Sequence, residues 1–178
     1  MRWIKRLGIV VIAFLVISAA LGLHYILPKH DVVHVTGVEV KRVDDDGVVN
    51  AENPAEGPTR DMYFINTADP DSNKVRVYRN EDTGWGFPWY FKFDSADVQA
   101  RAQDFSRNSN QLALIRYYGW RLQMFSTFPN ITDIEATTTR DEPLPIFNIL
   151  FFLVVGGVIM AVFLATRRRS QRRLDRPI

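Results

Sequence analysis

The 178-residue sequence contains no cysteine and only three histidines. The lack of cysteine excludes disulfides, thiolate nucleophiles, iron–sulfur clusters and zinc sites with cysteine ligands. His30 and His34 lie four residues apart in a valine-rich segment. An extended chain separates residues at that spacing by about 13 Å, too far for one metal ion. We therefore predict no metal site and no cofactor.

Catalytic motifs are also missing. Nucleophilic catalysis needs a base beside the attacking hydroxyl group, yet no serine of the central segment has a neighbouring histidine. There is no Gly-x-Ser-x-Gly motif either. The sequence therefore predicts that the protein is not an enzyme and has no catalytic residues.

Charge is absent from two long apolar runs. Residues 7–27 and 144–166 contain no Asp, Glu, Lys or Arg. A helix rises about 1.5 Å per residue and the hydrocarbon core of a bilayer is about 30 Å thick, so each run is long enough to cross it. We expect one transmembrane helix in each run.

Positive charge flanks both runs on the side of the chain ends. Residues 1–6 have a net charge of +3, and the tail, residues 167–178, has six arginines and one aspartate, or +5. Because the whole chain has +2, the remainder has −6. The positive-inside rule then predicts a bacterial inner-membrane protein with both termini cytoplasmic and residues 28–143 periplasmic. The alternative for the first run is a cleaved signal peptide ending near Ser18-Ala19-Ala20, although the run is longer than usual for one.

The central segment predicts a small α+β domain with a mostly antiparallel sheet. A helix is expected from Asp94 or Ser95 to Asn108, with Val98, Ala102 and Phe105 on one face. The first strand should contain a bulge at Gly37, where the alternation of valines shifts. The expected strands are 32–43, 62–66, 74–79, 112–118, 120–125 and 131–136.

Residues 84–93 are rich in aromatic side chains as well as in glycine and proline. Strand-like alternation puts Phe87, Trp89, Phe91 and Phe93 on one face, which favours packing against the apolar face of the helix. The alternative is an exposed platform for a glycan or a partner protein. In that case the candidate interaction surface is Trp85, Trp89 and Tyr90.

The segment NEDTGWGFPWYFKFDSADVQA and the motif YYGWR, set between two apolar runs, resemble the domain-of-unknown-function 1523 family. The resemblance covers essentially the whole chain. It implies an uncharacterised bacterial membrane protein and no catalytic residue.

In the second apolar run, Gly157, Ala161 and Ala165 recur every four residues. This small-residue stripe is typical of helices that approach each other closely. Packing within the chain, against Phe14 and Val10, and packing against another protein remain alternatives. The basic tail is expected to face anionic lipid rather than nucleic acid, through Arg167, Arg168, Arg169, Arg172 and Arg173.

Two functions follow from these patterns. The first is a non-catalytic accessory or assembly subunit of an inner-membrane complex, with lipid and another membrane protein as partners. The second is a periplasmic module, anchored in the inner membrane, that recognises a glycan or another small ligand.

Overall fold

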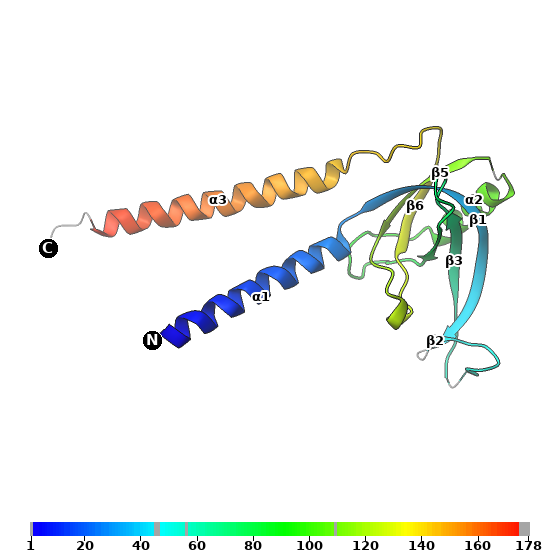
Figure 1. Ribbon diagram of the computed structural model, residues 1–178, viewed down its shortest axis with the longest axis horizontal. Coiled ribbons are helices and arrows are strands. Elements are labelled where there is room, and N and C mark those ends of the chain that lie inside the picture. The colour runs from blue at the N-terminus through cyan, green and yellow to red at the C-terminus, as the bar shows by residue number, and fades with distance from the viewer. Residues whose placement is uncertain (1, 45–46, 56, 109, 175–178) are drawn as a thin grey trace. The chain divides into compact units, whose positions relative to one another are not determined.

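The computed structural model describes residues 2–44, 47–55, 57–108 and 110–174 (Figure 1). The chain forms two compact units, Met1–Pro143 and Leu144–Ile178. The first contains helix α1 (Arg2–Ile26) and a β-domain, and the second contains helix α3 (Ile146–Leu174).

Both long helices are apolar and exposed. The stretches Arg6–Ile26 and Ile146–Arg167 have mean hydropathies of 2.5 and 2.8, and their apolar windows are not buried in the structure. Large apolar side chains point outward around the whole circumference, as in a helix surrounded by lipid. Helix α3 begins directly after Pro145, a residue suited to the start of a helix because it lacks the amide hydrogen. The two predicted apolar helices are therefore confirmed in length and composition.

The part of the chain that follows α1 in the sequence forms five strands, which close into a small barrel. Their order is β1-β3-β4-β6-β5, and β5 pairs with β1 again. Strand β1 is long enough to pair with two strands. Its first part pairs with β5 and its second part with β3. The two-residue strand β2 (Gly47–Val48) pairs with the end of β1. The five barrel strands are β1 (Lys29–Asp44), β3 (Arg60–Ala68), β4 (Val75–Asn80), β5 (Leu112–Tyr118) and β6 (Asn130–Thr137).

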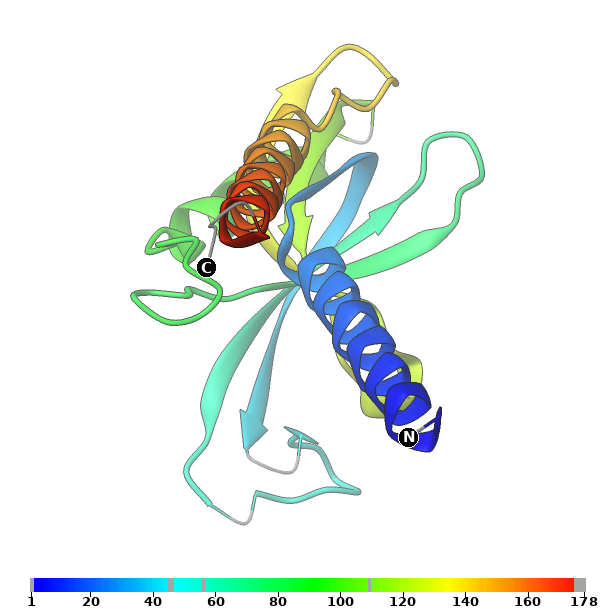
Figure 2. The same ribbon diagram turned by 90° about the vertical axis from the view of Figure 1, so that its left-hand side faces the viewer.

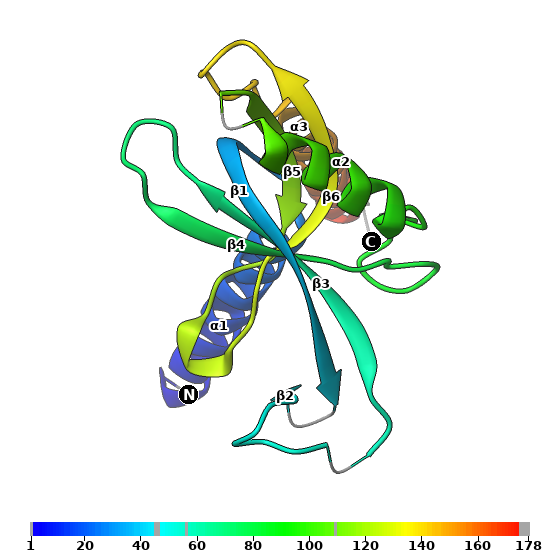
Figure 3. The same cartoon turned by 90° about the vertical axis from the view of Figure 1, so that its right-hand side faces the viewer.

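All neighbouring strands are antiparallel except β4 and β6, which form a short parallel contact at Arg79 and Asn130. Helix α2 (Ser95–Arg107) connects β4 to β5 and packs against β1, β3, β4 and β6 (Figure 3). This arrangement is a partly open Greek-key barrel, the architecture of the OB-fold. The closure of the barrel leaves β1 without a long free edge and buries the inward-facing side chains.

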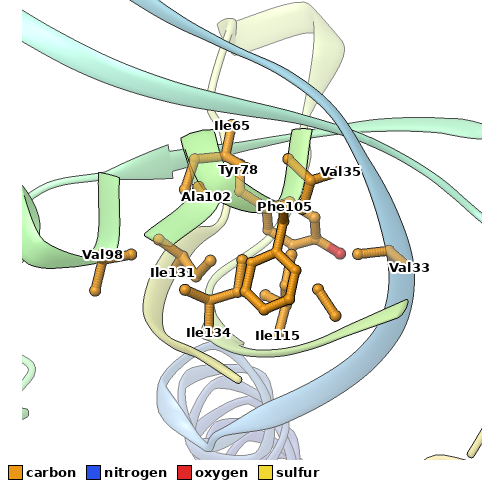
Figure 4. Packing of buried hydrophobic residues seen from close by; sticks show 11 residues of the cluster. Val33, Val35, Ile65, Tyr78, Val98, Ala102, Phe105, Ile115, Ile131 and Ile134 are labelled. Atoms are coloured by element: carbon orange, nitrogen blue, oxygen red, sulfur yellow. The ribbon is translucent and has the colours of Figure 1, made fainter. Parts of the chain in front are cut away.

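The hydrophobic core lies between the barrel strands and α2 (Figure 4). Val98, Ala102 and Phe105 cover it from the helix, as their spacing predicts. Tyr78 and Ile115 are fully buried among the side chains from the strands. The helical period of 3.6 residues places these three helix residues on one face, so a single stripe closes the barrel interior.

Most predicted elements are confirmed, including the helix, the hairpin and the irregularity between Val35 and Gly37. The strand predicted at 120–125 is wrong. Its residues form a turn that contains the short 3₁₀ helix η1 (Gln123–Phe125), closed by a bridge between Leu122 and Thr127. The Trp120 side chain bonds to His24 of α1, and the Arg121 side chain bonds to the carbonyl oxygen of Thr127 within the turn.

Candidate functional site

The aromatic loop, defined here as residues 84–93, presents its rings to the outside. Trp85, Phe87, Trp89, Phe91 and Phe93 are between 53 % and 79 % exposed. The interpretation that the alternating residues pack in the core against α2 is therefore wrong. Alternation would require an extended strand, whereas Gly84 and Phe91 have φ values of 53° and 51° and turn the chain.

The exposed rings of the aromatic loop touch mainly one another. Trp85 meets Phe91 and Phe93 edge-on at centroid distances of 5.5 Å, and Phe87 meets Trp89 at 5.3 Å. Edge-to-face pairs of this kind are favourable beyond the area that they bury. The pairs hold the rings in two groups, Trp85 with Phe91 and Phe93, and Phe87 with Trp89, and all five rings stay largely exposed.

Tyr90 has a different role from the other aromatic residues of the loop. Its hydroxyl group donates a hydrogen bond of 2.5 Å to the carbonyl oxygen of Ile26, and its ring stacks on Tyr118 at 4.7 Å. Burial raises the pKa of the Tyr90 hydroxyl well above its usual range. Of the predicted interaction surface, Trp85 and Trp89 thus face outward, while Tyr90 fastens the loop to the last residue of α1.

Lys92 turns into the protein and anchors the other end of the loop. The residue is 4 % exposed, and its ammonium group donates to the carbonyl oxygen of Ile131 at 2.8 Å and to the side-chain oxygen of Asn80. Burial lowers the pKa of Lys92 to about 8. No local sequence pattern marks Lys92 as a buried residue, because its partners come from two strands that are distant in the chain.

Residues of the motif YYGWR bond to the end of α1, the helix drawn in blue in Figure 2. The backbone N–H of Gly119 donates to the carbonyl oxygen of Tyr25 at 2.8 Å, and the Trp120 indole donates to Nδ1 of His24 at 2.7 Å. Gly119 has φ 96°, and a Cβ there would lie 3.4 Å from the Cα of Pro129. Glycine is favoured here because side chains with L chirality rarely adopt this φ value, whereas the distance to Pro129 is an ordinary contact.

A groove of about 360 Å³ is lined by β3, the end of β1, Arg79 of β4 and the turn before β6, and it extends to Tyr25 at the end of α1. Arg60 and Arg79 lie along it, and both pair with Glu81, at 3.3 and 3.1 Å. The turn at η1 contributes Phe125, which is 69 % exposed. The other apolar lining residues include Val43, Met62, Phe64 and Phe128. The arrangement suits an apolar segment that also offers an acceptor group to the arginines.

A second polar cluster joins three strands on another part of the barrel. The Asp31 carboxylate accepts hydrogen bonds from Arg76 and Tyr78, and Tyr117 approaches it at 3.4 Å. Burial raises the pKa of the Tyr117 hydroxyl, as it does that of Tyr78. These hydrogen bonds and the Arg76 guanidinium satisfy a partly buried carboxylate. We assign it to holding β1, β4 and β5 together.

The histidines have separate surroundings. His34 contacts the carbonyl oxygen of Gln111 at 3.3 Å, and burial and the nearby Arg116 lower the pKa of His30. In the described parts of the chain, no three His, Asp or Glu side chains come together in a way that could hold a metal ion.

On α3, Gly157 has open space beside it, because an added Cβ would meet no atom within 4 Å. Ala161 and Ala165 lie on the same exposed helix. Arg167 is the last exposed residue of the apolar stretch, and the side chains of Arg168, Arg169, Arg172 and Arg173 lie outside the described residues.

The fold and the surfaces define a class of protein with a small barrel domain between two helices of membrane-spanning length and composition. The chain belongs to the family described as "Protein of unknown function (DUF1523)", whose model matches residues 1–170. It is 50 % identical over 141 residues to a protein of Haemophilus influenzae described as "Uncharacterized protein", covering 78 % of this chain and 80 % of that protein. No solved structure matches the chain.

Proposed function

We propose that the protein is a non-catalytic accessory or assembly subunit of an inner-membrane complex. In this proposal α1 and α3 cross the membrane, both termini are cytoplasmic and the barrel is periplasmic. The segregation of positive charge to the chain ends supports this orientation. Arg167 and the rest of the basic tail then meet the anionic headgroups of the cytoplasmic leaflet.

The observation that carries the proposal is the position of the groove. It begins beside Tyr25, where the apolar part of α1 ends, and continues along β3 and the end of β1. A segment bound there has to lie close to the membrane surface. The periplasmic part of another inner-membrane protein, just outside its own transmembrane helix, meets this condition.

The small-residue stripe of α3 supports the same proposal from within the bilayer. A helix that presents Gly157 and Ala161 permits close backbone approach of a second helix. Replacing both with leucine raises hydrophobicity, so insertion should be retained while close packing is lost.

A test of the groove compares Phe125→Ser with Val75→Ser. The two side chains are 69 % and 68 % exposed, but Val75 lies outside the groove. We expect affinity purification in mild detergent to recover one stoichiometric membrane protein with the wild type and with Val75→Ser. Phe125→Ser should lose it. Recovery of the same protein with all three forms would contradict the role of the groove.

The alternative function is recognition of a glycan or another small envelope ligand. It is favoured by the barrel architecture, since OB-folds bind oligosaccharides on the corresponding face, and by the aromatic rings of the groove. A solitary protein after mild detergent extraction, together with saturable binding of a cell-wall oligosaccharide that Phe125→Ser weakens, would favour this alternative.

The orientation has its own test. Reporter fusions after Asn108 should be active only outside the cytoplasm, and fusions in the tail after Arg173 only inside. Cytoplasmic activity after Asn108 would overturn the topology. Intact mass spectrometry of the mature protein distinguishes an uncleaved α1 from a signal peptide, because cleavage would leave a chain that begins near Leu21.

A further inference from the structure

The outward surface of the aromatic loop is apolar and uncharged. The loop contains one charged residue, Lys92, and this side chain points inward to Ile131 and Asn80. Five aromatic side chains remain exposed. Large apolar side chains that are exposed close together in the chain, rather than singly, mark a surface that contacts a membrane or another molecule.

The structure also places this surface next to the end of α1. Tyr90, in the middle of the loop, bonds to Ile26, which is the last residue of α1 and of its apolar stretch. Tyr118, on which Tyr90 stacks, also packs edge-on against Tyr25. The aromatic loop is therefore held at the level at which α1 ends.

The turn after β5 adds apolar side chains at the same end of α1. Trp120 bonds to His24 and packs edge-on against Tyr25. Met124, in η1, is 89 % exposed. Tryptophan and tyrosine are enriched at the boundary between lipid headgroups and acyl chains, where an amphipathic ring contacts both phases. Two separate segments, the aromatic loop and the turn after β5, thus place aromatic residues beside the end of α1.

We propose that the aromatic loop inserts its exposed rings into the headgroup region of the leaflet in which α1 ends, and so holds the barrel against the lipid surface. The occupant of this surface is the bilayer, in continuity with α1. The inference rests on the proposed placement of α1 across the membrane. Insertion of the loop would also fix the distance of the groove from the lipid surface, because Tyr25 both lines the groove and packs against Tyr118, on which the loop is stacked.

Site-directed spin labelling tests the insertion directly, since the natural chain has no cysteine to remove. Trp89→Cys probes the loop, Val16→Cys the middle of α1 and Val75→Cys the hairpin between β3 and β4. The replaced side chains are 68 %, 62 % and 68 % exposed, so all three sites accept a label without disturbing the core. The full chain is reconstituted, without other proteins, in vesicles of phosphatidylethanolamine and phosphatidylglycerol.

We expect the label at residue 89 to have less access to a water-soluble nickel reagent and more access to oxygen than the label at residue 75, with values between those of residues 75 and 16. The label at residue 75 should keep its access to nickel. Trp85→Cys should repeat the result for residue 89, and an unchanged midpoint of urea unfolding, followed by far-ultraviolet circular dichroism, checks that the labelled proteins are folded.

The outcomes separate the two proposals. A water-accessible label at residue 16 would mean that α1 does not cross the bilayer, so the proposed placement fails. A lipid-exposed label at residue 16 with a label at residue 89 as accessible to nickel as that at residue 75 would overturn the insertion alone. Protection of residue 89 that appears only when a partner protein is added would also overturn it and assign the loop to that partner.

Discussion

The aromatic loop and helix α2 are neighbours in the chain and both contain large apolar side chains, yet they have opposite surroundings. Phe105 of α2 is 8 % exposed, whereas Phe91 of the loop is 53 % exposed. The difference comes from the backbone. The helix repeats its apolar residues on one face that the barrel interior accepts, while the loop turns at Gly84 and Phe91 and directs its rings away from the barrel.

This comparison shows that apolar composition alone does not define a core. A side chain is buried when a regular element carries it to a surface with matching shape. In the loop, Tyr90 and Lys92 point inward and donate hydrogen bonds to backbone carbonyl oxygens, whereas the five purely apolar or indole rings stay exposed. Each of the following predictions changes one side of the comparison.

The largest effect is expected for Phe105→Ala. Truncating a buried phenylalanine removes apolar contacts and leaves a cavity, so the free energy of unfolding should fall by about 3–5 kcal/mol. Urea denaturation of the full chain in detergent micelles, followed by near-ultraviolet circular dichroism, measures the loss. A change below about 1 kcal/mol would show that α2 does not close the core.

The free energy of unfolding should depend on pH through the buried side chain of Lys92. Its folded-state pKa of about 8 lies below the usual 10.5, so the unfolded chain binds more protons between these values. The free energy of unfolding should therefore rise as the pH increases from 8 toward 10, by the order of 1–3 kcal/mol. Below pH 8, Lys92 is protonated in both the folded and the unfolded chain, so it gives the free energy of unfolding no further dependence on pH.

Lys92→Met is the control for this dependence and should flatten the rise in stability. The interval has to end near pH 10, because the buried tyrosines have raised pKa values and destabilise the folded state at higher pH. An equally steep rise in Lys92→Met would assign the dependence to another group.

Tyr90→Phe isolates the hydrogen bond between the loop and α1. The ring still stacks on Tyr118, but the 2.5 Å bond to the Ile26 carbonyl is lost. Stability should fall by about 0.5–1.5 kcal/mol. Hydrogen exchange measured by mass spectrometry should become faster in residues 84–93 and stay unchanged in α2. Uniform acceleration in both segments would mean that the bond supports the whole barrel.

The smallest effect is expected for Phe91→Ala, the same substitution as in α2 but on the exposed side of the comparison. Because the ring contacts mainly Trp85, the free energy of unfolding in detergent should change by no more than about 0.5 kcal/mol. In lipid vesicles, association of the loop should weaken. A loss in detergent as large as that of Phe105→Ala would place Phe91 in the core after all.

Local patterns in the sequence determined the elements of this protein. Two uncharged runs are long enough for membrane spans, the spacing of Val98, Ala102 and Phe105 defines the buried face of α2, and the valine phase shift marks the irregularity in β1. These signals depend on residues a few positions apart, where the geometry of helices and strands fixes which side chains share a face.

Only the tertiary structure decided how these elements meet. The closure of β1 onto β5, the groove that reaches Tyr25, and the inward turn of Lys92 depend on residues far apart in the chain. The aromatic loop shows the reason most directly. Its alternation favoured a core strand, and the exposed surface was the alternative. The exposed arrangement results from positive φ values and from the bond between Tyr90 and α1, neither of which has a periodic signature in sequence.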